Sequence, residues 1–94
     1  MLSKKQAAFD LAEKVGLPLG SGKYSSFIGG IEPEILPNNV VELNVYVGED
    51  LMNNEDSKQE VHEIAKKVIE QNNYGFDSFQ INFMEMYIDN DHEN

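Results

Sequence analysis

The segment that most constrains the fold of this chain is residues 40–47. Its apolar and polar side chains alternate, with Val41, Leu43, Val45 and Val47 on one side and Val40, Glu42, Asn44 and Tyr46 on the other. A period of two predicts a β-strand with one buried face and one open face. Pro37-Asn38-Asn39 directly before it predicts a turn, so residues 27–36 should form a preceding strand of a hairpin.

The strand predicted at residues 27–36 should lie at an edge of the sheet. Pro33 cannot donate a backbone hydrogen bond to a neighbouring strand, and Gly29-Gly30 suggests a β-bulge. The sequence therefore favours a sheet in which this strand has one neighbour.

Two amphipathic helices flank the hairpin. In residues 4–15 and 57–71 the apolar side chains recur at helical spacing, with Ala8, Leu11, Ala12 and Val15 in the first and Val61, Ile64, Ala65, Val68 and Ile69 in the second. Ser3 with Gln6, and Ser57 with Glu60, predict capping boxes. Gly16 and Pro18 should end the first helix, so residues 17–26 are expected to form a loop. Residues 48–56, between the predicted strand and the second helix, should form another loop.

A last strand is expected at about residues 76–88. Its alternation shifts phase after Phe83, so that Met84, Met86 and Ile88 are apolar, and the acidic tail 89–94 should be frayed. The chain is thus expected to be a single α+β domain over 1–94 with the order α-β-β-α-β. Its two helices should cover one face of a three-stranded mixed sheet with strand order 1-2-3, or 2-1-3 as the alternative. Val61, Ile64, Val68, Leu43 and Ile81 should be buried together.

The charge balance narrows the class of partner. The chain has 17 Asp and Glu, 7 Lys and no Arg, which gives a net charge of −10. Such a surface repels nucleic acid and anionic membranes and attracts basic proteins. Cys is absent, so disulfides and thiolate metal sites are excluded. No apolar run approaches the roughly 20 residues that span a bilayer, and a cytoplasmic location is expected.

Three segments invite a chemical interpretation. Gly20-Ser21-Gly22-Lys23 resembles part of a phosphate-binding loop, but Leu17 and Tyr24 stand where that motif needs Gly and Ser or Thr. His62 lies at the flank of the apolar stripe, but catalysis there would also need a group that stabilises developing charge, and the chain has few lysines and no arginine. His92 lies in the acidic tail. Each is better interpreted as structural, so we expect no catalytic residue, no metal and no cofactor.

The candidate binding residues are those of the open sheet face and the acids that follow it. They are Glu42, Asn44, Tyr46, Glu49, Asp50, Glu63, Gln80, Asn82, Met84 and Met86. Tyr and Asn combine contact area with hydrogen bonding, and Met adapts to irregular partners. The acids at 55, 56 and 60 are explained by the positive end of a helix dipole alone. Whether the remaining acids imitate a nucleic-acid backbone is left open.

These observations lead to a hypothesis of function. The chain is expected to be a non-enzymatic protein-binding module, such as an immunity protein or an inhibitor from a mobile element, that occupies a basic protein. The alternative is a small assembly subunit that self-associates through its last strand, for example as a homodimer. The segment Leu2 to Ala7 with Ala12 and Gly16-Leu17-Pro18 resembles the first helix of PepSY-type domains, and this short resemblance implies no function.

Overall fold

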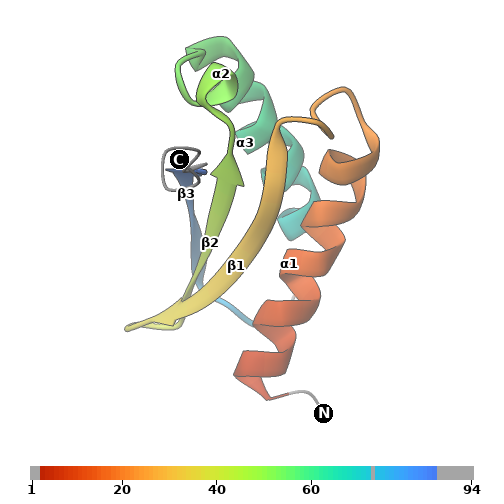
Figure 1. The fold of residues 1–94 in the computed structure, drawn as a ribbon. Coiled ribbons are helices and arrows are strands. Elements are labelled where there is room, and N and C mark those ends of the chain that lie inside the picture. The colour runs from red at the N-terminus through yellow and green to blue at the C-terminus, as the bar shows by residue number, and fades with distance from the viewer. Residues whose placement is uncertain (1–2, 73, 87–94) are drawn as a thin grey trace, which may run out of the picture.

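The computed structural model describes residues 3–72 and 74–86 as a two-layer α+β domain, with a three-stranded sheet on one side and helices on the other (Figure 1). The elements are α1 (Lys4–Ser21), β1 (Ile28–Leu36), β2 (Val40–Val47), α2 (Glu49–Met52), α3 (Glu55–Gln71) and β3 (Ser78–Glu85). The strand order is β1-β2-β3, with β1 antiparallel and β3 parallel to β2. The predicted fold class and the order 1-2-3 are confirmed, and the order 2-1-3 is excluded.

Helix α1 is longer than the sequence predicts. Ser3 caps it in the expected capping box with Gln6, but the helix continues through Pro18 to Ser21. Leu19 is 1% exposed, and its burial one turn after Val15 extends the apolar stripe past the proline. Packing of this last turn outweighs a proline cost of about 3 kcal/mol, so the predicted stop at Gly16 and Pro18 is wrong.

The hairpin of β1 and β2 forms as predicted. Asn38 and Asn39 have φ of 69° and 61°, which this residue type tolerates better than most, and they turn the chain between the strands. The β1–β2 register shifts between Ile28 and Gly30, which confirms a bulge at the glycine pair. Pro33 lies in β1, which is an edge strand.

The second half of the chain differs from the prediction in its boundaries. The predicted loop 48–56 contains the short helix α2, and α3 begins at Glu55. Asn54 is the N-cap of α3 and accepts from the Ser57 N–H (3.0 Å), so a cap at Ser57 is wrong. Strand β3 is shorter than the predicted 76–88, and residues 87–94, with the predicted tail, lie outside the described residues.

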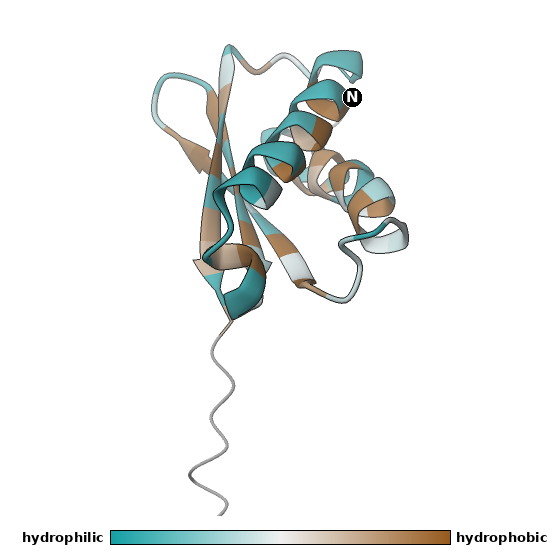
Figure 2. Cartoon of the chain, turned by 90° about the horizontal axis from the view of Figure 1, so that it is seen from above, coloured by the Kyte–Doolittle hydropathy of each residue, from teal (hydrophilic) through white to brown (hydrophobic). Residues whose placement is uncertain are grey.

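The core lies between the sheet and the helices, where the apolar segments of both layers face each other (Figure 2). Val41, Leu43, Val45 and Val47 are 0% exposed, as is Val61 of α3. Ile64, Val68 and Ile81 pack against this cluster but are only partly buried. The prediction that these three side chains are buried together with Val61 and Leu43 is therefore wrong in the extent of their burial. The same alternation that buries one face of β2 presents Glu42, Asn44 and Tyr46 on the other face.

Candidate functional site

The face of the sheet turned away from the helices carries three rows of side chains. The strand register aligns Glu34 with Glu42 and Gln80, then Glu32 with Asn44 and Asn82, then Gly30 with Tyr46 and Met84. We call this set, with Met86 at the end of β3, the outer face. It contains seven of the predicted binding residues: Glu42, Asn44, Tyr46, Gln80, Asn82, Met84 and Met86.

Hydrogen bonds connect neighbouring strands across the outer face. The Tyr46 hydroxyl donates to Glu32 Oε1 (2.7 Å), and Asn44 Nδ2 donates to the Glu32 carbonyl oxygen (3.4 Å). Asn82 Nδ2 donates to Glu42 Oε2 (2.6 Å) and to Asn44 Oδ1 (3.3 Å). These hydrogen bonds fix the orientation of the polar side chains on the outer face.

The hydrogen bond to Glu32 also changes the acidity of Tyr46. It raises the pKa of the Tyr46 hydroxyl above its usual value, with smaller contributions in the same direction from desolvation and from the charges of Glu32 and Glu34. A phenol beside carboxylates resists ionisation because the phenolate would add a like charge. Tyr46 therefore stays a neutral donor at physiological pH.

The outer face is negatively charged and has no cation of its own. No lysine occurs in any strand, and all seven lysines belong to the helices or to segments next to them. Glu32, Glu34 and Glu42 thus lie together without an ion pair among the described residues. Such a concentration of one charge attracts a surface of the opposite charge.

The methionines lie at the end of the outer face that is nearest to α2. Met84 is 42% exposed, whereas Met86 is partly buried and packs against the bulge of β1. A Cβ atom placed on Gly29 would overlap with Met86 Sδ, so the absence of a side chain at Gly29 leaves room for the Met86 side chain. Met86 thereby reaches across the sheet from β3 to β1.

The three remaining predicted residues lie elsewhere. Glu49 and Asp50 are exposed in the first turn of α2, which follows β2 directly and continues the acidic surface beyond Tyr46. Glu63 is exposed on α3, in the helix layer on the opposite side of the sheet, where it accepts from Gln59 Nε2 (3.1 Å). The structure therefore does not bring Glu63 together with the outer face.

Sequence reasoning missed Glu32 and Glu34 as members of the outer face. The order Ile31-Glu32-Pro33-Glu34-Ile35 contains the alternation that reveals them, but the glycines and the proline drew the interpretation toward edge position alone. Once β1 is paired in register with β2, both carboxylates face the same side as Glu42 and Asn44.

The helix layer provides a second polar cluster, which connects the segment after α1 to α3. Tyr24, 9% exposed, donates its hydroxyl proton to Glu60 Oε1, and Lys23 Nζ lies 2.9 Å from the same oxygen. The hydrogen bond from Tyr24, followed by that from Lys23, lowers the pKa of Glu60. The cluster fastens the segment after α1 to α3.

The segments with an apparent chemical motif have no catalytic arrangement. Gly20 and Ser21 form the last turn of α1, where carbonyl oxygens face outward, and a phosphate needs the N–H groups of a helix start. His62 is half-exposed and its ring centroid lies 6.2 Å from that of Phe79. Within residues 3–72 and 74–86 no three His, Cys, Asp or Glu side chains converge as they would around a metal ion. His92 lies outside those ranges.

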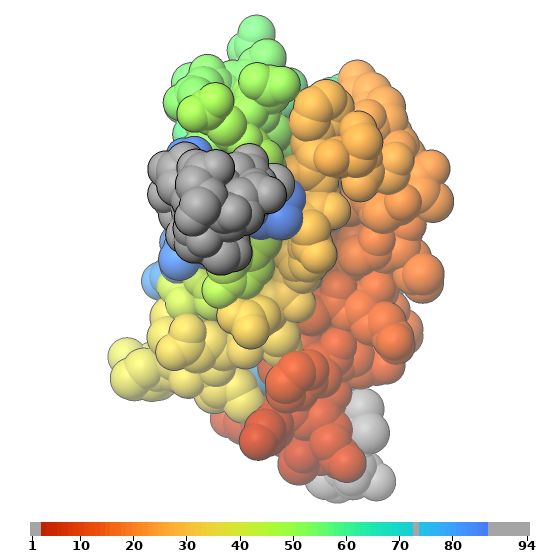
Figure 3. All heavy atoms as spheres, viewed as in Figure 1, coloured from red at the N-terminus to blue at the C-terminus, as the bar shows by residue number. Residues whose placement is uncertain are grey.

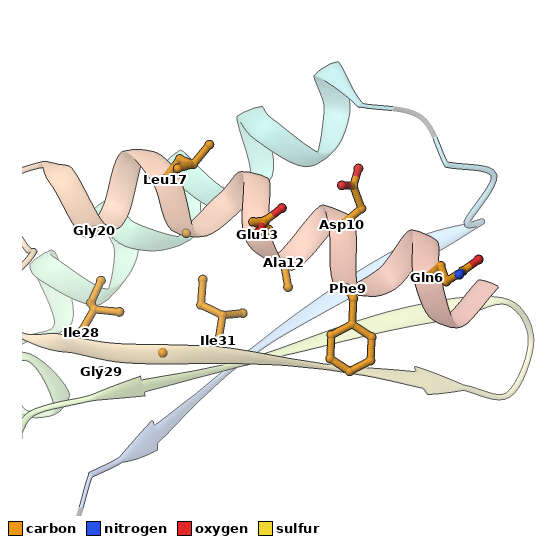
Figure 4. Close-up of a pocket in the computed structure, with 12 residues that line it drawn as sticks. Gln6, Phe9, Asp10, Ala12, Glu13, Leu17, Gly20, Ile28, Gly29 and Ile31 are labelled. Carbon is orange, nitrogen blue, oxygen red and sulfur yellow. The ribbon is translucent and has the colours of Figure 1, made fainter. Parts of the chain in front are cut away.

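A groove of about 930 Å³ runs between α1 and β1 (Figure 4). Phe9 extends from α1 toward the strands, and Ile28 and Ile31 extend from β1 toward α1. The space-filling view shows the two elements side by side along one flank of the molecule (Figure 3). Phe9 and Leu17 are 55% and 67% exposed. The groove is lined mainly by apolar groups and holds no paired nucleophile and base.

Neither α1 nor α3 combines the length and the apolarity that a membrane-crossing helix needs, and the same holds for the rest of the chain that the structure describes.

Comparisons with known proteins do not assign the chain to a family. No family model, no curated protein and no solved structure matches this chain.

Proposed function

We propose that this chain is a non-enzymatic protein-binding module that uses its outer face to occupy a basic protein, as an inhibitor or an immunity protein does. The observation that carries the proposal is the composition of that face. Three carboxylates, three amide side chains and a tyrosine lie together without a lysine. Arg and Lys of a partner would find acceptors there, and charge complementarity would guide the encounter.

The apolar end of the outer face supports the same proposal. Met84 is 42% exposed beside Tyr46, and both lie between the carboxylates and the acidic start of α2. Interfaces commonly combine a central aromatic or methionine contact with a charged periphery. We expect Tyr46 and Met84 to supply the lasting contact, and the acids around them to supply the orientation.

The proposal can be tested with two triple variants that change the net charge equally. In the first, Glu32→Gln, Glu34→Gln and Glu42→Gln neutralise the outer face. In the second, Glu13→Gln, Glu63→Gln and Glu70→Gln neutralise exposed acids of the helix layer. Each variant and the unmodified chain would be immobilised to capture proteins from the native host, followed by mass spectrometry.

We expect a basic protein to be captured by the unmodified chain and by the helix-layer variant, and to be lost from the outer-face variant. Equal loss from both variants would indicate an effect of net charge alone and would refute a specific site. Capture that is unaffected by either variant would place the interface away from these carboxylates.

A further inference from the structure

The sheet has two edges, and they differ in their capacity to accept another strand. In β1, Pro33 lacks an N–H group, Glu32 and Glu34 flank it, and a bulge interrupts the pairing at Gly29-Gly30. Proline, charge and bulges are the devices by which proteins prevent association of sheet edges. Strand β3 has no proline, no bulge in its pairing with β2 and a single charged residue, Glu85, at its end.

The backbone of β3 has hydrogen-bonding groups that point away from the sheet. The Met86 N–H donates to the Val47 carbonyl oxygen (2.7 Å), and the direction of N–H groups alternates along a strand. The N–H groups of residues 79, 81, 83 and 85 therefore point away from β2. No acceptor for them exists within the part of the chain that the structure describes. A further strand beside β3 would supply four donors with acceptors.

The side chains at this edge are also incompletely covered. Phe79, Ile81 and Phe83 face the helices, yet they are only partly buried, whereas their partners Val41, Leu43 and Val45 on β2 are 0% exposed. A hollow of about 200 Å³ lies beside them between α3 and β3, and Phe83 contributes to its wall. Apolar side chains from a neighbouring strand would complete this part of the core.

We propose that the occupant of this edge is a second copy of the chain, which pairs its own β3 antiparallel to β3 and forms a continuous six-stranded sheet. The outward side chains near the middle of the edge, Gln80 and Asn82, are uncharged amides that tolerate a copy of themselves. The same pairing at β1 would set glutamates against glutamates. Because β1 is protected, association stops at a closed dimer and does not extend into a filament.

The proposal is independent of the basic partner and predicts the opposite response to salt. Two copies with a net charge of −10 each repel one another, and added salt screens this repulsion. Self-association should therefore strengthen as salt rises, whereas attraction to a basic protein should weaken. Sedimentation equilibrium of the purified chain, without any partner, at low and high salt tests the first effect alone.

Substitution of Ile81 separates backbone pairing from side-chain effects. Ile81→Pro removes one outward N–H group, as Pro33 does in β1, and Ile81→Val shortens the side chain but keeps that group. We expect a concentration-dependent dimer for the unmodified chain and for Ile81→Val, and a monomer for Ile81→Pro at every concentration. Circular dichroism would verify that each variant is folded.

Several results would overturn the proposal. They are a monomeric unmodified chain at all concentrations and salts, a folded Ile81→Pro variant that still dimerises, and a dimer that is abolished by Leu17→Asp in the α1–β1 groove. If Ile81→Pro does not fold, hydrogen exchange of the unmodified chain decides. The amides of Ile81 and Phe83 should be protected at high concentration and exchange rapidly at low concentration, and rates independent of concentration would refute the pairing.

Discussion

Replacement of Leu43 by alanine tests the packing that supports the outer face. Leu43 is 0% exposed at the centre of β2, and its neighbours Glu42 and Asn44 point to the opposite side. The substitution removes three buried carbons, worth about 2.4 kcal/mol by transfer, and adds a cavity term. We expect a loss of about 3–4 kcal/mol from a total stability of roughly 5–14 kcal/mol for a chain of this length.

Ile64→Ala is the matched control, because it also removes three carbons. Ile64 is only partly buried on α3, so its loss should be about 1–2 kcal/mol, below the 2–5 kcal/mol typical of an enclosed site. Urea denaturation followed by circular dichroism measures both variants, with the slope of each transition as a check on two-state unfolding. An equal or larger loss for Ile64→Ala would refute the assigned order of burial and the orientation of α3.

Three further predictions concern acid stability, binding kinetics and the position of Met86. The lowered pKa of Glu60 stabilises the folded chain above the unfolded pKa near 4.5, and this contribution disappears as the pH falls through the folded value. The urea midpoint should therefore fall less between pH 7 and pH 3 in Glu60→Gln than in a Glu70→Gln control. In surface-plasmon measurements on the captured partner, charge reversal of Glu49 and Asp50 should mainly slow association. Tyr46→Ala and Met84→Ala should mainly hasten dissociation, and unchanged dissociation would show that these two residues lie outside the interface. Gly29→Ala should displace the Met86 side chain with little loss of stability, because the new methyl group meets the end of a flexible side chain. If the methyl chemical shift of Met86 is the same in the variant and in the unmodified chain, the contact is contradicted.

The elements with strong periodicity could be predicted from the sequence. Residues 40–47 have the observed bounds because their alternation is uninterrupted, and Pro33 correctly indicated an edge. The end of α1 could not be predicted in this way. Local signals at Gly16 and Pro18 favour a stop, and only the tertiary burial of Leu19 reveals why the helix continues.

The candidate site was predictable where it depends on one strand and was incomplete where it depends on pairing. Glu42, Asn44 and Tyr46 follow from the alternation of β2 alone. Glu32 and Glu34 join them only through the β1–β2 register, which the bulge at the glycines obscures. Glu63 was grouped with them by charge, although it lies on α3, and the sheet separates this helix from the outer face.

The pairing of Glu34 with Glu42 connects the binding proposal to stability. These residues lie directly opposite each other on β1 and β2, and like charges in that position destabilise a sheet by about 0.2–1 kcal/mol. Glu34→Gln should therefore raise the free energy of unfolding by a similar amount at low salt, and the gain should shrink as salt screens the repulsion.

The corresponding change at Glu70, an exposed acid of α3, serves as the comparison. If Glu34→Gln stabilises the chain while it weakens capture of a basic protein, the outer face keeps a destabilising charge that its binding role requires, which is the trade-off expected of a functional surface. If Glu34→Gln lowers the stability at low salt, or if Glu70→Gln raises it equally, the repulsion across β1 and β2 is not the cause. The carboxylates of the outer face then lose this link to function.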